Sequence, residues 1–124
     1  MEHHNSRHPV ALVVEDDIDQ RLLLATLLEE AELDVVECES AEAAICLLDR
    51  IGDKVRRLFA DVQLAGVMSG ADLAMQAKRR FPDMRVVVTS GQNRPDRLPP
   101  DTKFMPKPWR ALDVLREAER SVAA

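Results

Sequence analysis

The feature that most constrains the fold of this chain is the alternation of short apolar runs with segments of helical periodicity. The apolar runs cover residues 10–14, 35–38, 58–60, 86–88 and 103–105. Short runs of this kind, separated by helical segments, are typical of the strands of a parallel sheet that is covered by helices on both faces. The sequence therefore predicts a single layered α/β domain.

Apolar residues recur at helical spacing in four segments between and after these runs. The first two helices are indicated by Leu24, Leu27, Leu28 and Ala31, and by Ala41, Ala44, Ile45 and Leu48. Ser40 is a candidate N-cap for the second helix. The spacing predicts a third helix over residues 70–81, ended by Pro82, and a last helix over residues 110–122. The buried face expected for the last helix consists of Ala111, Val114, Leu115, Ala118 and Val122.

The connection between the fourth and fifth apolar runs differs from the others. Residues 90–101, SGQNRPDRLPPD, contain three prolines, which makes a regular helix longer than about one turn unfavourable. Because crossovers between parallel strands are right-handed, the pattern predicts a flavodoxin-like, doubly wound sheet with the strand order 2-1-3-4-5. The fourth helix of this fold is expected to be shortened or broken.

Length and composition limit the class of protein. We expect a disordered lead-in over residues 1–9 and one folded domain over residues 10–124. No apolar run approaches the length of about 20 residues that spans a membrane, and the net charge of −5 argues against nucleic-acid binding. The spacing of Cys38 and Cys46 fits neither a redox motif nor a zinc site. We therefore expect a cytoplasmic monomer or weak dimer with two buried or half-buried thiols.

Chemically active side chains follow four of the five predicted strands. They are Glu15 and Asp16 after the first strand, Asp61 after the third, Thr89 after the fourth and Lys107 after the fifth. The carboxyl ends of parallel strands meet at one edge of the sheet, where ligands bind in folds of this class. The sequence thus predicts that these groups converge.

The converging groups have a shared chemistry. Carboxylates at one point repel each other and form a set of hard oxygen ligands that suits Mg²⁺. A lysine and a hydroxyl beside them supply the positive charge and the hydrogen-bond donor that a transferring phosphoryl group needs. A carboxylate beside the metal can also be the nucleophile that forms an acyl phosphate.

Four motifs together resemble the response-regulator receiver domains of two-component signal transduction. They are VVEDD at residues 13–17, LFADVQLAGVMSG at 58–70, VVVTSG at 86–91 and FMPKP at 104–108. Each motif is weak alone, but together they cover essentially the whole domain in the family's order. The resemblance implies a signalling switch rather than a turnover enzyme, one that catalyses its own phosphorylation and dephosphorylation.

The resemblance implies a role for each acidic residue of the predicted site. Asp61 would accept the phosphoryl group from a phosphohistidine on a histidine kinase or a histidine phosphotransfer protein. Asp16 would bind Mg²⁺ directly, Glu15 would bind it directly or through a water, and the backbone carbonyl of Gln63 would be a further ligand. Asp17 lies just beyond the family's acidic pair, and we assign it to the start of the first helix as a cap or first-turn acid.

The resemblance also implies the roles of the remaining site residues. Thr89 would donate its hydroxyl to the bound phosphoryl group and move toward it on activation. Lys107 would pair with a phosphoryl oxygen and, before phosphorylation, with Asp61. Phe104 occupies the place of the family's switch aromatic, and the peptide bond between Lys107 and Pro108 resembles the family's cis bond.

The chain departs from the family pattern in three places, one of which is Pro106, which removes a backbone donor just before Lys107. The proline-rich segment at residues 90–101 replaces the fourth helix, which contributes much of the output surface in the family. Trp109 and Arg110 stand where the family often has phenylalanine and a capping serine or threonine, so the last helix is expected to lack a good N-cap. The downstream partner protein therefore stays unknown.

Other classes of protein remain as alternatives or are disfavoured. A flavodoxin-type FMN binder would need a phosphate loop after the first strand, where this chain is acidic. A haloacid-dehalogenase-like phosphatase would need an aspartate where Gln63 stands. Two alternatives stay open: a pseudo-receiver that binds partners without phosphorylation, and the receiver part of a hybrid histidine kinase.

Overall fold

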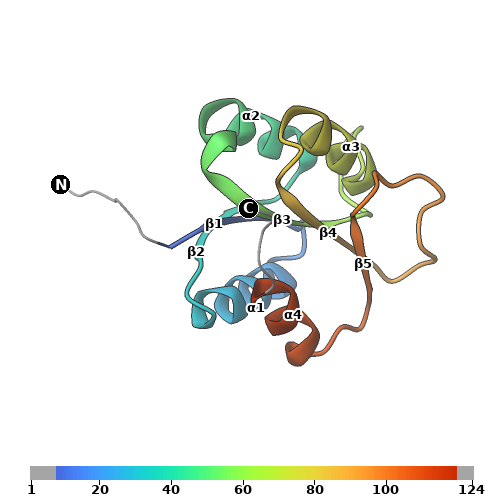
Figure 1. The fold of residues 1–124 in the computed structure, drawn as a ribbon. Helices are drawn as coiled ribbons and strands as arrows, with labels where there is room; N and C mark the ends of the chain where they lie inside the picture. Colours follow the sequence, from blue (N-terminus) through green and yellow to red (C-terminus); the bar gives the residue numbers. More distant parts are fainter. Residues whose placement is uncertain (1–7, 120–124) are drawn as a thin grey trace.

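A five-stranded parallel sheet is the centre of the fold in the computed structural model, which describes residues 8–119 (Figure 1). The strand order is β2-β1-β3-β4-β5, which confirms the predicted topology. The strands are β1 (Val10–Val14), β2 (Asp34–Cys38), β3 (Val55–Asp61), β4 (Arg85–Ser90) and β5 (Lys103–Pro106). Every pair of neighbouring strands is parallel. Residues 1–7, which include most of the predicted lead-in, lie outside the described residues.

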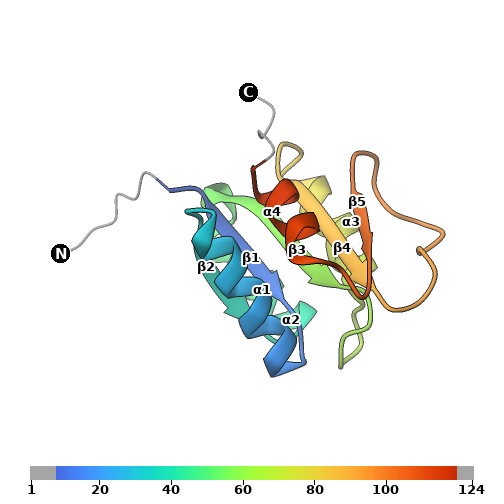
Figure 2. The same cartoon turned by 90° about the horizontal axis from the view of Figure 1, so that it is seen from below.

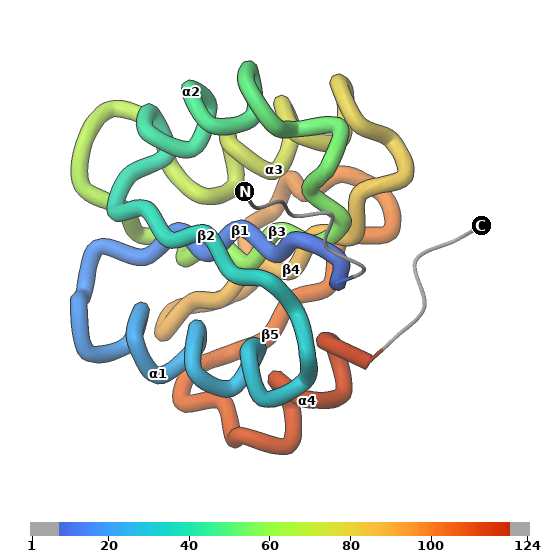
Figure 3. The backbone as a smooth tube through the Cα atoms, turned by 90° about the vertical axis from the view of Figure 1, so that its left-hand side faces the viewer, coloured from blue at the N-terminus to red at the C-terminus, as the bar shows by residue number. Residues whose placement is uncertain are grey.

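Helices cover both faces of the sheet. They are α1 (Ile18–Glu30), α2 (Ala41–Ile51), α3 (Gly70–Arg80) and α4 (Ala111–Glu119), with a short 3₁₀ helix η1 (Gly52–Lys54) after α2. The view along the sheet edge shows α2 and α3 on one face and α1 and α4 on the other (Figure 3). Figure 2 shows α1 and α4 lying side by side against the sheet. The predicted doubly wound arrangement is therefore correct. Within residues 8–119, no helix is long and apolar enough to cross a membrane.

The apolar runs are continuous because both faces of the sheet are buried. Successive strand residues point to opposite faces, so Leu12 and Val14 pack beneath α2 and α3 while Ala11 and Val13 pack beneath α1 and α4. All four side chains are at most 1% exposed. β3 starts three residues before the apolar run at residues 58–60. Arg57 belongs to the strand because its backbone pairs with β1 on one side and β4 on the other, and it is buried despite its charge.

Side chains cap the starts of the first two helices as the sequence predicts. Asp17 accepts a hydrogen bond from the backbone N–H of Gln20 at 3.0 Å. Ser40 accepts one from the backbone N–H of Ala43, also at 3.0 Å. These bonds satisfy backbone donors that have no partner within the helix, and they fix where the chain leaves β1 and β2.

The last helix differs from its prediction at its start. It begins at Ala111, which is exposed rather than buried. Val114 and Ala118 are buried as predicted, and Leu115 is half-buried. The expected lack of a good N-cap is partly offset, because the backbone N–H of Arg110 donates to Asp113 Oδ2 at 2.9 Å. Val122 lies outside the described residues.

The segment between β4 and β5 contains no helix, as predicted. Residues 91–102, all of which the structure describes, form a loop that Figure 1 shows extending beside β5. Pro99 is buried and Leu98 packs against the core on the α2 and α3 face. Leu98 thus packs against the core on the face where a helix would otherwise lie.

The two cysteines have different surroundings. Both are free thiols, with Cys38 half-buried at the end of β2 and Cys46 exposed on α2. The prediction of a buried or half-buried thiol is wrong for Cys46. In α2, Ala44 and Leu48 face the core of the protein. Cys46 lies two positions from each of them in the sequence and therefore on the opposite side of the helix.

Candidate functional site

The ends of β1, β3, β4 and β5 bring the predicted site residues to one edge of the sheet. Backbone hydrogen bonds continue the sheet past the strands: the N–H of Val62 donates to the carbonyl of Thr89 at 2.8 Å. The N–H of Lys107 donates to the carbonyl of Ser90, also at 2.8 Å, and that of Glu15 to the carbonyl of Cys38 at 3.1 Å. The site therefore stands on the sheet itself.

Three carboxylates gather at this edge. One ligand oxygen from each of Glu15, Asp16 and Asp61 lies within 4.8 Å of the other two. Glu15 and Asp61 are 4% and 6% exposed, whereas Asp16 is exposed to solvent. Hard oxygen donors with one side open to water match the coordination that Mg²⁺ prefers, because this ion keeps several of its waters. The donor set therefore fits a magnesium ion.

Lys107 joins two of these carboxylates. Its Nζ donates to Asp61 Oδ2 at 2.7 Å and to Glu15 Oε1 at 3.2 Å. Burial lowers the pKa of Lys107, but the hydrogen bonds and negative charges of Asp61 and Glu15 outweigh burial and raise it overall. Lys107 is thus a fixed positive charge at neutral pH, held within reach of whatever binds at Asp61.

The Glu15 carboxyl is the most perturbed acid of the site. Burial is the largest cause, and together with the charge of Asp61 it raises the pKa of Glu15 to about 7. The backbone N–H of Asp17, which donates to Glu15 Oε2 at 3.1 Å, and the charge of Lys107 oppose this increase. One lysine therefore does not neutralise the buried acids, and a divalent cation would relieve their repulsion.

The loop that follows Asp61 is bonded through Gln63 to Asp61 on β3 and to Ser90 on β4. The backbone N–H of Gln63 donates to Asp61 Oδ1 at 3.1 Å, and its side-chain Oε1 accepts from the Ser90 hydroxyl at 2.9 Å. Gly70, at the start of α3, packs so closely that a Cβ there would lie 2.0 Å from the backbone carbonyl of Asp61. Both oxygens of the Asp61 carboxylate thus have donors, from Gln63 and from Lys107.

Thr89 and Phe104 lie on the neighbouring strands. Thr89 is the register partner of Asp61 across β3 and β4, and it is 3% exposed. Phe104 is the partner of Val88 across β4 and β5 and is partly buried against the core beneath α2 and α3. These two residues connect the site to the two strands that flank the helix-free loop.

An apolar surface borders the site, and sequence reasoning missed it. A cavity of about 450 Å³ lies beside Lys107, lined also by Leu23 of α1 and by Trp109. Leu22 and Leu23 are 50% and 53% exposed, and Ile18 is 59% exposed. The signal in the sequence is that α1 has leucines on its solvent side as well as on its core side, which an amphipathic helix does not need.

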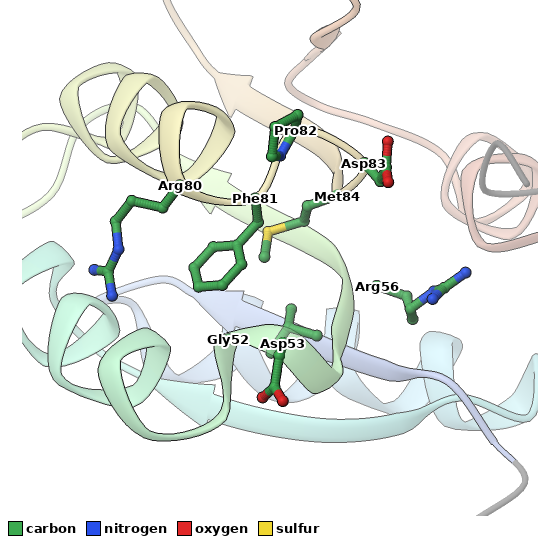
Figure 4. A pocket seen from close by; sticks show the side chains of 9 residues that line it. Gly52, Asp53, Arg56, Arg80, Phe81, Pro82, Asp83 and Met84 are labelled. Atoms are coloured by element: carbon green, nitrogen blue, oxygen red, sulfur yellow. The ribbon is translucent and has the colours of Figure 1, made fainter.

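A second cavity, of about 270 Å³, lies at the opposite end of the sheet, where β3 begins (Figure 4). The Phe81 ring packs on Gly52, so that a Cβ at this glycine would meet the ring at 2.2 Å. Arg80 lies over the same ring at 5.3 Å and pairs with Asp49 at 2.7 Å. The charged residues that line this cavity are of both signs, and the cavity lies at the end of the sheet away from Asp61. It therefore has no part in the site at Asp61.

Comparison with known proteins identifies the family. The chain matches the response regulator receiver domain family over residues 11–99. No curated protein matches the chain. A response regulator receiver protein from Sinorhizobium medicae superposes with a TM-score of 0.84 at 21% identity, over 90% of this chain and 92% of that one. This likeness shows the fold.

Two further structures belong to larger signalling proteins. The receiver domain of the hybrid histidine kinase CckA has a TM-score of 0.77 at 24% identity, over 89% of this chain and 95% of that one. NtrX from Brucella abortus has a TM-score of 0.73 at 27% identity, over 90% of this chain but only 26% of that one. Since the family match spans well over half of the sequence, this chain belongs to the response regulator receiver domain family.

Proposed function

We propose that this chain is a phosphorelay switch in which Asp61 accepts a phosphoryl group from a phosphohistidine in a Mg²⁺-dependent reaction. The observation that carries the proposal is the network in which Lys107 bonds to Asp61 at 2.7 Å and to Glu15 at 3.2 Å beside a third acid. A structural domain has no need of three crowded carboxylates at a strand edge, two of them buried, because burying charge is costly.

The transfer step uses the Asp61 carboxylate as the nucleophile. One of its oxygens forms a bond to phosphorus as the bond between phosphorus and the donor imidazole nitrogen breaks. The imidazole leaves with the electron pair of that bond and takes a proton from solvent. The product is an aspartyl phosphate, and attack of water on its phosphorus returns Asp61 and inorganic phosphate.

Lys107 and Thr89 stabilise the charge that develops on the phosphoryl oxygens. Lys107 already contacts Asp61, so a small side-chain movement transfers its hydrogen bond to a phosphoryl oxygen. Thr89 lies beside Asp61 on the next strand, and its hydroxyl is the second donor. Fixed donors of this kind act strongly where water is largely excluded.

The acids around Asp61 are the proposed metal ligands. Asp16 and Asp61 would hold Mg²⁺ directly, Glu15 directly or through a water, and the backbone carbonyl of Gln63 would complete the protein's contribution. When bound, Mg²⁺ supplies the positive charge that offsets repulsion between these carboxylates and an incoming phosphoryl group. The three acidic oxygens lie within 4.8 Å of one another, which supports this assignment.

The apolar surface beside the site is the proposed docking surface for the phosphodonor. A donor histidine on a kinase or phosphotransfer protein has to reach Asp61, and Leu22 and Leu23 of α1 and the cavity at Trp109 border that approach. Exposed apolar side chains grouped in this way are typical of protein interfaces. We propose that the donor presents an apolar helix to α1.

Phosphorylation is proposed to act as a population shift. The aspartyl phosphate favours the state in which Thr89 has moved toward it and Phe104 has turned inward. A cytoplasmic partner protein would read this state. The same chemistry serves a receiver within a hybrid kinase, the class to which the structurally similar CckA domain belongs.

Phosphoramidate tests the proposal, because this small donor carries the same phosphorus–nitrogen bond as phosphohistidine. Intact-mass measurement is expected to show one added phosphoryl group on the wild type with Mg²⁺, and none with a chelator. Asp61→Asn should gain no adduct, whereas the control Asp19→Asn, an exposed acid on α1, should behave as the wild type. Absence of any adduct on the wild type would favour a pseudo-receiver.

A further inference from the structure

Glu42 of α2 binds the loop that follows Asp61. Its Oε2 accepts hydrogen bonds from the backbone N–H groups of Val67 at 3.2 Å and of Met68 at 3.0 Å. Residues 62–69, here named the β3–α3 loop, connect the end of β3 to the start of α3. A side chain from a different helix thus supports the middle of the loop that begins at Asp61.

The Glu42 carboxylate is suited to this contact. It lies in the first turn of α2, where the helix dipole favours negative charge. Hydrogen bonds from its own backbone N–H and from those of Met68 and Val67 lower its pKa, so the carboxylate is ionised at neutral pH. An ionised acceptor bonds more strongly to backbone donors than a neutral one.

Gly66 allows the carboxylate and the loop to approach each other. Its φ is +102°, and a Cβ there would lie 2.9 Å from Glu42 Oε1. A residue with a side chain would be strained by this backbone conformation and would also press on the carboxylate. The glycine and the glutamate therefore form one local structure.

The ends of the β3–α3 loop have their own supports. At the start, the N–H of Gln63 donates to Asp61 Oδ1 at 3.1 Å. At the end, Ser69 and Asp72 form a reciprocal capping box at the start of α3. Between them, Val67 is 98% exposed and buries almost no side-chain surface. The two bonds to Glu42 thus hold the loop tip together with the side chains of Leu64 and Met68, which pack partly against the core.

We infer that Glu42 is a positioning residue for the Asp61 site. By holding the tip of the β3–α3 loop, it keeps the Gln63 N–H on Asp61 and thereby orients the Gln63 carbonyl, which the proposed function assigns to the metal. This inference rests on the proposed function for its consequence, namely Mg²⁺ affinity and phosphorylation rate. Glu42 itself touches neither the metal nor the phosphoryl group.

The test compares Glu42→Ala and Glu42→Gln with the control Glu39→Ala, which removes the same charge from an exposed position next to the N-cap of α2. Two quantities are measured: the Mg²⁺ dissociation constant from Trp109 fluorescence with the metal alone, and hydrogen exchange at the amides of Val67 and Met68. Glu42→Ala should weaken Mg²⁺ binding about tenfold and speed exchange at both amides. Glu42→Gln keeps an oxygen acceptor, so it should retain most of the Mg²⁺ affinity and most of the protection of the two amides from exchange.

The outcomes separate this inference from the proposed function. Faster exchange in Glu42→Ala with unchanged Mg²⁺ affinity would make Glu42 a structural support only, and unchanged exchange would show that the contact does not hold the loop in solution. Either result overturns the inference. If the wild type binds Mg²⁺ but takes no phosphoryl group from phosphoramidate, the proposed function fails while the positioning role of Glu42 is still measured.

Discussion

Two neighbouring parts of the sheet edge are built in different ways. At the acid and lysine site, strand-to-strand backbone bonds and the 2.7 Å contact between Lys107 and Asp61 hold these two side chains in place. In the loop at residues 91–102, the packing of Leu98 and Pro99 holds a segment without regular structure. The proposed chemistry depends on the strand ends, whereas the surface beside β5 depends on the connection after β4. The fold can therefore keep the site at the strand ends while the connection after β4 changes.

Loss of the lysine should have the largest effect on the site. Lys107→Ala removes the only cation that pairs with the carboxylates of Asp61 and Glu15 in residues 8–119, and it should lower the phosphorylation rate about 100-fold. Intact mass followed over time with phosphoramidate measures this rate. Lys54→Ala, which removes an exposed charge from η1, is the control. A rate within threefold of the wild type would show that Lys107 is not part of the chemistry.

A smaller effect is expected at the link between the site and the loop. Thr89→Ala leaves Asp61 and Lys107 in place, so the adduct should still form, while the conformational response falls about tenfold. The response is measured as the change in NMR signals of Phe104 when beryllofluoride and Mg²⁺ are added. Thr89→Ser keeps the hydroxyl and should respond as the wild type does. A full response in Thr89→Ala would separate Phe104 from the switch.

The fold was predictable because its main signals are local in sequence. Each strand contains an apolar run, and Asp17 and Ser40 occupy cap positions that their residue types favour. The topology then brings the residues after the strands to one edge, which explains why Asp61 and Lys107 could be chosen before any geometry was known. Two kinds of knowledge were added: the handedness of the crossovers gave the topology, and the resemblance to receiver domains gave the roles of the site residues.

The features that sequence reasoning missed depend on distant partners. Glu42 contacts residues 25 and 26 positions away, and an exposed glutamate in a first turn has no mark that distinguishes it. Glu117 is buried and bonds to Arg85 of β4 at 3.1 Å, although charged residues are rarely buried. Leu22 lies outside the predicted core stripe of α1, but the helical pattern alone does not show that an exposed leucine belongs to a larger apolar surface.

A substitution in the loop should leave the chemistry unchanged. Leu98→Ala removes part of the packing that attaches residues 91–102 to the core, and it should lower the free energy of unfolding by about 1–2 kcal/mol. Denaturant unfolding measures the stability, and phosphorylation by phosphoramidate should stay within twofold of the wild-type rate. Arg97→Ala, at an exposed position of the same loop, should change neither. A large loss of rate in Leu98→Ala would show that the two regions are coupled.

The smallest effect is expected at the start of α4, beside the loop that carries Lys107. Asp113 accepts from the backbone N–H of Arg110, and this bond lowers the pKa of Asp113 below 3.8. A depressed pKa in the folded state adds stability above pH 3.8 that is lost as the pH falls through the folded value. Asp113→Asn should therefore melt slightly below the wild type at pH 7, and the difference should shrink in acid. A constant difference would exclude the carboxylate as its cause.

Reductive trapping tests the central claim, that Asp61 forms an acyl phosphate, most directly. Borohydride reduces an aspartyl phosphate to homoserine, so peptide mapping after treatment with phosphoramidate locates the modified residue. The account predicts homoserine at position 61 when Mg²⁺ and the donor are both present, and aspartate there when a chelator replaces the metal. Homoserine at another acid, or unmodified Asp61 under all conditions, would contradict it.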